Sequence, residues 1–223
     1  MKPWEVLERT VTTNGTELSL ARHTSEYVIQ VDGQHLMSSR MHSSEDQLAV
    51  LGCAQARTLP RPRVLVGGLG MGFTLRAALD CLPLSAHVLV AELVPAVVRW
   101  NRGALGPLAG HPLADPRVTV EEVDVGVALG SNPNTFDAVL LDVDNGPAAL
   151  AAPSNAGLYD SAGVATAHRA LKPGGVLAVW SAQEDRRFER RLLAGGFRVQ
   201  REHVRGREKG RGPRHTILLA RRP

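Results

Sequence analysis

The sequence predicts an α/β fold built on a doubly wound, mainly parallel sheet with a C-terminal antiparallel hairpin. Short apolar strands alternate with helix-like segments from about residue 64 to residue 194, which is the pattern of strand–helix–strand units. The strands lack polar alternation, so we expect both faces of the sheet to be buried. Two further strand patterns follow residue 196 and indicate the hairpin.

The first 42 residues have a different pattern, which predicts a small antiparallel β-unit before the main domain. Residues 17–22 alternate apolar and polar side chains, and Asp32-Gly33 is a turn signal between two later strand patterns. The serines and acids at residues 43–46 then predict the first turn of a helix. We therefore expect a β-unit at residues 1–42 and an α/β domain at residues 43–223.

The expected elements of the main domain follow each other as strand, helix, strand over most of its length. The strands cover residues 64–66, 87–91, 118–121, 136–141 and 176–180, and the hairpin uses residues 197–204 and 215–220. The later helices cover residues 74–82, 95–103, 161–171 and 185–194. In the β-unit, the expected strands are residues 17–22, 27–31 and 34–38.

The composition is that of an ordinary globular protein. The chain has 223 residues, of which 43% are hydrophobic and 22% are charged. It contains no apolar run of about 18 residues and no signal-peptide pattern, so we expect a cytoplasmic protein without membrane contact. Cys53 and Cys81 have no metal-binding or redox spacing and are expected to be buried free thiols. The net charge of +4 is a mild excess, so we expect no nucleic-acid partner, and the basic run at residues 205–212 is expected to be a hairpin loop.

A glycine-rich loop follows the first strand of the main domain and precedes a helix. Gly67, Gly68, Gly70 and Gly72 permit positive φ angles and a close approach of the backbone to a ligand. The helix behind them offers free N–H groups that bind anions. The same glycines also suit a plain tight turn, so the loop alone does not decide between the two interpretations.

An acid at the end of the next strand makes the loop more specific. Glu92 stands where a carboxylate binds both ribose hydroxyls of a nucleoside, a pairing that NAD and S-adenosyl ligands share. Asp124 and Val125 follow the third strand, where an S-adenosyl site holds the adenine, although Asp124 also suits the N-cap of a helix. The predicted cofactor-binding residues are Gly67, Gly68, Gly70, Gly72, Glu92, Asp124 and Val125.

Two more acids follow the fourth strand of the main domain. If the chain stays extended there, the side chains of Asp142 and Asp144 point the same way. The carboxyl edge of an open α/β sheet is where such folds bind ligands, so we expect these acids to join the nucleoside site.

Seven stretches between Tyr27 and Trp180 match one known family. They are residues 31–34, 44–46, 64–68, 90–93, 115–118, 136–139 and 171–176. In these stretches the chain resembles the spermidine synthase family, the polyamine aminopropyltransferases, which share the class I S-adenosylmethionine-dependent methyltransferase fold. The resemblance implies a Rossmann-like seven-stranded sheet that ends in the hairpin, and a homodimer, often formed through the N-terminal β-unit.

The chain departs from that family at two places in the expected site. Where the family's loop carries an Asp that helps to hold the amine substrate, this chain has Gly70. Asp142 stands at the place of the family's base, but the second acid of that motif is shifted to Asp144. A doubly charged diamine needs several carboxylates around it, so we expect an amine acceptor other than plain putrescine.

The resemblance implies aminopropyl transfer from decarboxylated S-adenosylmethionine, with methylthioadenosine as product and no metal. Intact S-adenosylmethionine as cofactor would instead give S-adenosylhomocysteine, by methyl transfer. We expect Asp142 to remove a proton from the acceptor and Asp144 to orient it, although both also suit ligand ordering without proton transfer. Three alternatives remain: a small-molecule methyltransferase, a non-catalytic nucleoside-binding homologue and an NAD-dependent oxidoreductase. The missing acid at Gly70 favours the methyltransferase. The intact acids Glu92, Asp124 and Asp142 count against a non-catalytic homologue, and the terminal hairpin counts against an NAD-dependent oxidoreductase.

Overall fold

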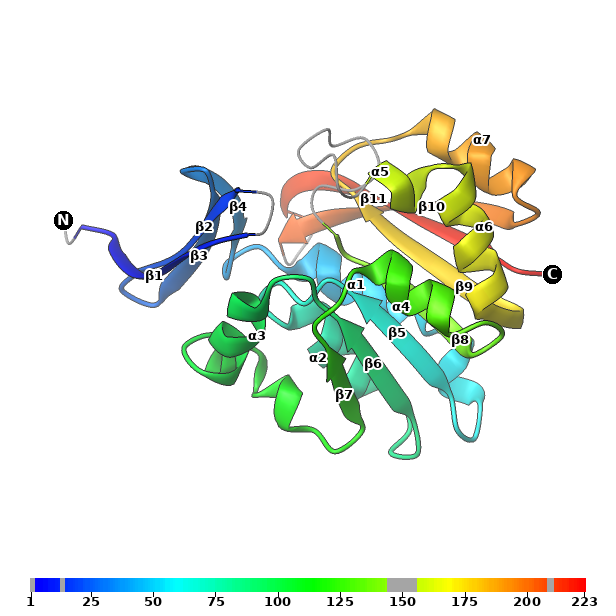
Figure 1. Cartoon of the computed structure of the whole chain (residues 1–223), viewed down its shortest axis with the longest axis horizontal. Helices are drawn as coiled ribbons and strands as arrows, with labels where there is room; N and C mark the ends of the chain where they lie inside the picture. Colours follow the sequence, from blue (N-terminus) through cyan, green and yellow to red (C-terminus); the bar gives the residue numbers. More distant parts are fainter. Residues whose placement is uncertain (1–2, 13–14, 144–155, 208–210) are drawn as a thin grey trace.

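The computed structural model describes residues 3–12, 15–143, 156–207 and 211–223. They form two sheets, a four-stranded antiparallel sheet at the N-terminus and a seven-stranded sheet flanked by helices (Figure 1). The strands are β1 (Glu5–Val11), β2 (Glu17–His23), β3 (Glu26–Val31), β4 (Gln34–Ser38), β5 (Arg63–Gly67), β6 (His87–Ala91), β7 (Val118–Glu121), β8 (Phe136–Leu141), β9 (Leu171–Ser181), β10 (Arg198–Arg207) and β11 (Arg211–Arg221). The helices are α1 (Ser43–Gly52), α2 (Phe73–Cys81), α3 (Pro95–Arg102), α4 (Val125–Ser131), α5 (Ala156–Tyr159), α6 (Ser161–Ala170) and α7 (Arg186–Ala194), with short 3₁₀ turns at Ala56–Thr58, Gly106–Ala109 and Pro112–Ala114.

The large sheet has the strand order β10-β11-β9-β8-β5-β6-β7. Strands β5 to β9 are parallel, whereas β11 pairs antiparallel with both β9 and β10. The predicted doubly wound sheet with its C-terminal hairpin is therefore confirmed. The chain reverses order after β7 and continues with β8 on the other side of β5, which opens a crevice at the carboxyl ends of the central strands.

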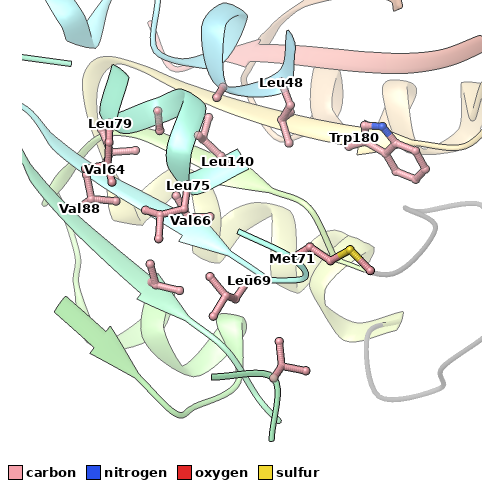
Figure 2. Close-up of a cluster of buried hydrophobic side chains, with 14 of the residues drawn as sticks. Leu48, Val64, Val66, Leu69, Met71, Leu75, Leu79, Val88, Leu140 and Trp180 are labelled. Carbon is pink, nitrogen blue, oxygen red and sulfur yellow. The ribbon is translucent and has the colours of Figure 1, made fainter. Parts of the chain in front are cut away.

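The core is divided between the two faces of this sheet, as the unbroken apolar strands predict. Val64 and Val66 of β5 join one buried cluster with residues of α1, α2 and α3, whereas Leu65 faces a second cluster with α4, α6 and α7. Figure 2 shows the first cluster, in which Leu75 of α2 lies next to Val66 of β5. This face carries α1, which leads in from the N-terminal sheet.

The N-terminal sheet has the order β1-β2-β3-β4, so it contains one strand more than the sequence pattern predicts. The extra strand, β1, escapes the pattern because Val6 and Val11 stay exposed and its polar side chains make surface ion pairs such as Arg22–Glu5. In contrast, Leu20 and Ile29 of the inner strands are buried in the same cluster as α1 and α2. The small sheet therefore packs on the face that carries α1.

Other differences from the predicted elements are local. Helix α4 has no strong apolar periodicity and begins at its N-cap, Asp124, whose side chain accepts hydrogen bonds from Gly126 and Val127. Strand β9 begins at Leu171 and includes the Pro-Gly-Gly run, because a bulge opposite Phe136 and Ala138 absorbs these residues. None of the described helices has the length and apolar character that crossing a membrane requires.

Candidate active site

The parallel register brings the predicted acids to one edge of the sheet. Gly67, the last residue of β5, is paired with Ala91 on one side and with Leu141 on the other. Glu92 and Asp142 directly follow those two partners, so they flank the glycine loop. Asp124 lies beyond β7, the outermost strand on the Glu92 side.

The glycine loop lies so close to the end of β8 that it has no room for a side chain at Gly68. This residue has a φ angle of +84°, and a Cβ there would be 2.4 Å from the carbonyl oxygen of Asp142. Backbone hydrogen bonds fix the same junction, from the N–H of Gly68 to Ala91 and from the N–H of Asp142 to Gly67. The loop is therefore a fixed element between two strand ends.

The two apolar residues of the loop turn inward. Leu69 and Met71 are only 4% and 2% exposed, and both belong to the cluster in Figure 2. Between them, Gly70 has a φ angle of +51° and lies under Met37 of β4, so that a Cβ at Gly70 would be 2.9 Å from the Met37 methyl carbon. The side-chain amide of Asn101, in α3, donates to the Gly70 carbonyl oxygen at 2.8 Å.

Glu92 is buried, and its carboxylate accepts hydrogen bonds from two backbone N–H groups, one in the glycine loop and one just after β6. Its Oε2 accepts a hydrogen bond from the N–H of Leu69, and its Oε1 accepts one from the N–H of Val94, both at 2.8 Å. Glu92 thus anchors the glycine loop at the carboxyl edge of the sheet.

Asp124 combines two features that the sequence leaves as alternatives. Its Oδ1 caps α4 by accepting the N–H groups of Gly126 and Val127. Its Oδ2 accepts no hydrogen bond from the described part of the chain, and the residue borders a cavity of about 230 Å³ between α4, α5 and α6. Val125 is buried and packs against Gly67, where a Cβ would be 2.8 Å from its Cγ1.

Asp142 faces the first turn of α2. Its Oδ2 accepts a hydrogen bond from the hydroxyl of Thr74 at 2.6 Å, and Thr74 itself is buried. Burial raises the pKa of Asp142 to about 6, while the Thr74 hydroxyl acts in the opposite direction by stabilising the ionised form. A carboxyl group with this pKa is able to accept and release a proton near neutral pH.

A second carboxyl group, Glu45 in the first turn of α1, lines the same narrow cavity as Asp142. Burial and then the charge of Asp142 raise the pKa of Glu45 to about 7, while the hydroxyl of Ser44, which donates to Oε2 at 2.5 Å, lowers it. The cavity also has apolar walls, formed by Met37, Leu69, Met71 and Phe73. Two carboxyl groups in one cavity interact strongly enough to titrate as a pair.

Asp144, the second predicted catalytic acid, lies outside the described residues, so its predicted role stays a prediction. The described residues contain no group of three or more His, Cys, Asp or Glu side chains arranged to hold a metal ion.

The sequence did not single out four residues that shape the site. Met37, Glu45, Thr74 and Asn101 come from β4, α1, α2 and α3, and only the tertiary fold brings them to the glycine loop. For Glu45 a signal existed, because residues 44–46 match the resembled family at the start of the first helix. That signal marks the helix and does not reveal the opposing Asp142.

Comparison with solved structures tests the fold. Spermidine synthase from Thermotoga maritima superposes with a TM-score of 0.73 at 18% sequence identity, over 98% of this chain and 73% of that one. This chain has the spermidine synthase fold. A spermidine synthase in complex with the transition-state analogue AdoDATO gives a TM-score of 0.72, also at 18% identity, over 98% of this chain and 72% of that one. A probable spermidine synthase from Corynebacterium glutamicum gives 0.63 at 18% identity, over 99% and 81% of the two chains.

Sequence comparison leads to the same group of proteins. Polyamine aminopropyltransferases 1 and 2 of Ralstonia nicotianae are each 32% identical to this chain over 127 residues. The match covers 56% of this chain but only 24% of each relative, so the chain spans about a quarter of the proteins that it matches. No family model matches the chain. The predicted resemblance to the spermidine synthase family is confirmed, in sequence by the aminopropyltransferases and in fold by the synthases.

Proposed function

We propose that this protein is a spermidine synthase-like transferase that moves an aminopropyl group from decarboxylated S-adenosylmethionine to an amine acceptor other than plain putrescine. The observation that carries the proposal is Asp142, a carboxyl group with a raised pKa that accepts a hydrogen bond from Thr74 at the carboxyl end of β8, next to the glycine loop. The sequence likeness to polyamine aminopropyltransferases supports the same reaction.

The residues of the carboxyl edge suit an S-adenosyl nucleoside. Glu92 places a carboxylate at the end of β6, where it would accept hydrogen bonds from ribose hydroxyls, and Oδ2 of Asp124, to which no described residue donates, would accept one from an adenine amino group. The backbone of Gly68 lies next to Glu92, between the ends of β6 and β8. When bound, this cofactor supplies an electrophilic carbon attached to a sulfonium.

The protein's own part in the reaction is to position the acceptor and to remove its proton. An ammonium group has no lone pair and cannot attack carbon, so a base must first accept a proton from it. We assign this step to Asp142, which Thr74 orients through the hydrogen bond to Oδ2, leaving Oδ1 to face the acceptor. Holding both reactants in contact supplies much of the remaining rate enhancement.

One observation favours a second candidate, methyl transfer from intact S-adenosylmethionine. The loop has no acid at Gly70, and the thioether of Met37 covers this position. An apolar neighbour does not repel the carboxylate that the intact cofactor carries, as an Asp there would. The two candidates therefore differ in the cofactor that the loop tolerates.

The test is to incubate the protein with each cofactor form and a panel of amines, and to measure methylthioadenosine and S-adenosylhomocysteine by chromatography. Amine-dependent methylthioadenosine from the decarboxylated cofactor supports the proposal, and Asp142→Asn should then lower kcat at least a hundredfold with cofactor affinity within a few-fold. Amine-dependent S-adenosylhomocysteine instead supports methyl transfer. Binding of either cofactor without turnover of any amine contradicts both and leaves the non-catalytic homologue.

We also propose that the protein is a homodimer that pairs through the N-terminal sheet. Strand β1 is the edge of that sheet, with unpaired backbone groups, and Trp4, Val6 and Val11 are exposed along it. Val6→Lys with Val11→Lys should give a monomer in sedimentation equilibrium if β1 is the contact. A dimer that persists in this variant contradicts the assignment.

We further propose that the protein works in the cytoplasm. Cys53 and Cys81 are free thiols, which suits a reducing compartment. Fractionation of cells that express the tagged chain tests this assignment, and recovery outside the cytoplasm contradicts it.

A further inference from the structure

The narrow cavity beside the glycine loop contains an acid that no part of the proposed mechanism has used so far. Glu45 and Asp142 reach this cavity from different elements, the first turn of α1 and the end of β8. The other residues of its wall are Met37, Ser38, Leu69, Met71, Phe73 and Thr74, so these two carboxyl groups are its only charged side chains among the described residues.

One of these carboxyl groups has an oxygen available for a ligand. Thr74 donates to Oδ2 of Asp142, and no described residue donates to Oδ1. A ligand with N–H donors and a positive charge would supply the hydrogen bond that Oδ1 lacks within the described residues, and would pair with the carboxylate charge.

The size and walls of the cavity restrict this ligand. Its free volume of about 10 Å³ is close to what one water molecule requires, and a primary ammonium group is of similar size. Met71 and Phe73 form apolar walls next to this space. A primary alkylamine joins an ammonium group of this size to an apolar chain.

Glu45 supplies an acid beside Asp142 that the glycine loop does not. Residue 70 of the loop is a glycine covered by Met37. Glu45 lines the cavity from the first turn of α1.

We propose that Glu45 is a specificity-determining residue that, together with Asp142, binds the acceptor as a primary alkylammonium. This inference rests on the proposed function, since it treats the cavity as the acceptor site. Glu45 fixes the ammonium group, and Asp142 accepts its proton before the nitrogen attacks.

The charges around Glu45 predict a measurable release of protons when an ammonium group binds between Glu45 and Asp142. Apart from Asp142, His42 acts on Glu45 from the start of α1, and its ring lies against Phe73 and Asp46. Burial raises the pKa of both acids, and the charge of Asp142 raises that of Glu45 further, so the pair without a ligand holds a proton at neutral pH for part of the time. An ammonium group between them favours two ionised carboxylates, so its binding must release a fraction of a proton.

The experiment compares wild type with Glu45→Gln, which keeps the size of the side chain, and with Glu122→Gln, the same substitution at an exposed residue outside the cavity, as a control. Calorimetry with n-butylamine and 1,4-diaminobutane, in phosphate and in Tris at pH 7, measures amine affinity and proton release without requiring turnover. Kinetics with the best amine then separate KM from kcat.

Glu45→Gln should weaken amine binding and raise the amine KM on the order of tenfold, abolish the buffer dependence of the enthalpy, and leave cofactor KM unchanged. Glu122→Gln should match wild type.

The outcomes separate this inference from the proposed function. Amine binding that depends on Glu45 in a protein without transferase activity contradicts the function and supports the inference. Amine-dependent turnover with an unchanged amine KM in Glu45→Gln supports the function and overturns the inference. Absence of amine binding to the wild-type protein, with and without methylthioadenosine, also overturns it. Glu45→Asp should restore part of the proton release, which a purely structural role would not predict.

Discussion

The methyl carbon of Met37 lies 2.9 Å from the point where a Cβ of residue 70 would stand, so a strand of the N-terminal sheet closes over the glycine loop of the main domain. The contact joins two sheets that are separate in their hydrogen bonding. It also explains why this loop accepts glycine at a position where the resembled family has an acid.

Gly70→Asp should therefore destabilise the protein and fail to create a useful carboxylate. The φ angle of +51° is one that Asp tolerates, so the main cost is the clash with Met37, on the order of 1–2 kcal/mol. Met37→Ala should recover part of that loss when combined with Gly70→Asp. Urea unfolding of the two single variants and the double variant measures the coupling, and simple additivity of the two effects would show that the contact is unimportant.

Thr74→Val should move the acid limb of the rate profile. The Thr74 hydroxyl stabilises ionised Asp142, so its removal raises the pKa of Asp142 further, by roughly one unit for a hydrogen bond to a charged group. Because the base must be ionised to act, the acid limb of kcat/KM should shift to higher pH. Thr74→Ser keeps the hydroxyl and should stay close to wild type. An identical acid limb in Thr74→Val would exclude Asp142 as the group that limits the rate.

The residues of the site differ in how far the sequence predicts their position. Apolar runs locate strand ends, and parallel strands share a carboxyl edge, so the sequence predicts one common edge for Gly70, Glu92, Asp124 and Asp142. No local pattern reports which helix lies over that edge. Thr74 therefore looked like an ordinary residue of a first turn, although it is the hydrogen-bond donor to Asp142.

The same limit applies to Met37 and Glu45. Their contacts depend on how the N-terminal sheet and α1 pack on the main sheet, which is decided by side chains far apart in the sequence, such as Leu20, Ile29 and Leu48 in one cluster. Strand β1 was missed for a related reason, since an exposed strand held by surface ion pairs has no apolar alternation.

The pH dependence of stability should reveal the pair of Glu45 and Asp142. The pKa values of both carboxyl groups are higher in the folded protein than in the unfolded chain, where they are about 4. The two groups therefore contribute most to the free energy of unfolding below pH 4, and this contribution is lost as the pH rises through 6 and 7. His168 and His215, whose pKa values burial lowers, act in the opposite direction over part of this range. The difference between wild type and Glu45→Gln isolates the pair.

Glu45→Gln should thus gain stability relative to wild type as pH rises from 5 to 8, by on the order of 2 kcal/mol. Urea midpoints at both pH values measure this gain. A constant difference between the two proteins across the range would mean that Glu45 is not raised in pKa by burial and by Asp142.

Two substitutions at Asp124 separate its capping role from its proposed role at the adenine. Asn caps a helix as well as Asp does, so Asp124→Asn should unfold like wild type but place an amide donor where the proposal requires an acceptor. Its affinity for methylthioadenosine should fall on the order of tenfold. Asp124→Ala should lose this affinity and about 1 kcal/mol of stability as well. Full affinity in Asp124→Asn would mean that the residue only caps α4.

Glu92→Gln tests whether one carboxylate serves both the loop and the ribose. A Gln side chain has one oxygen, so either Leu69 or Val94 must lose its acceptor and face an NH₂ group, which should cost about 1–3 kcal/mol in this buried place. Hydrogen exchange at the N–H of Leu69 or Val94 should accelerate accordingly. Glu122→Gln, an exposed neighbour on the same sheet edge, is the matched control. If Glu92→Gln binds methylthioadenosine as wild type does while the loop exchanges faster, Glu92 anchors the loop alone, and the ribose must be held by other residues of the carboxyl edge.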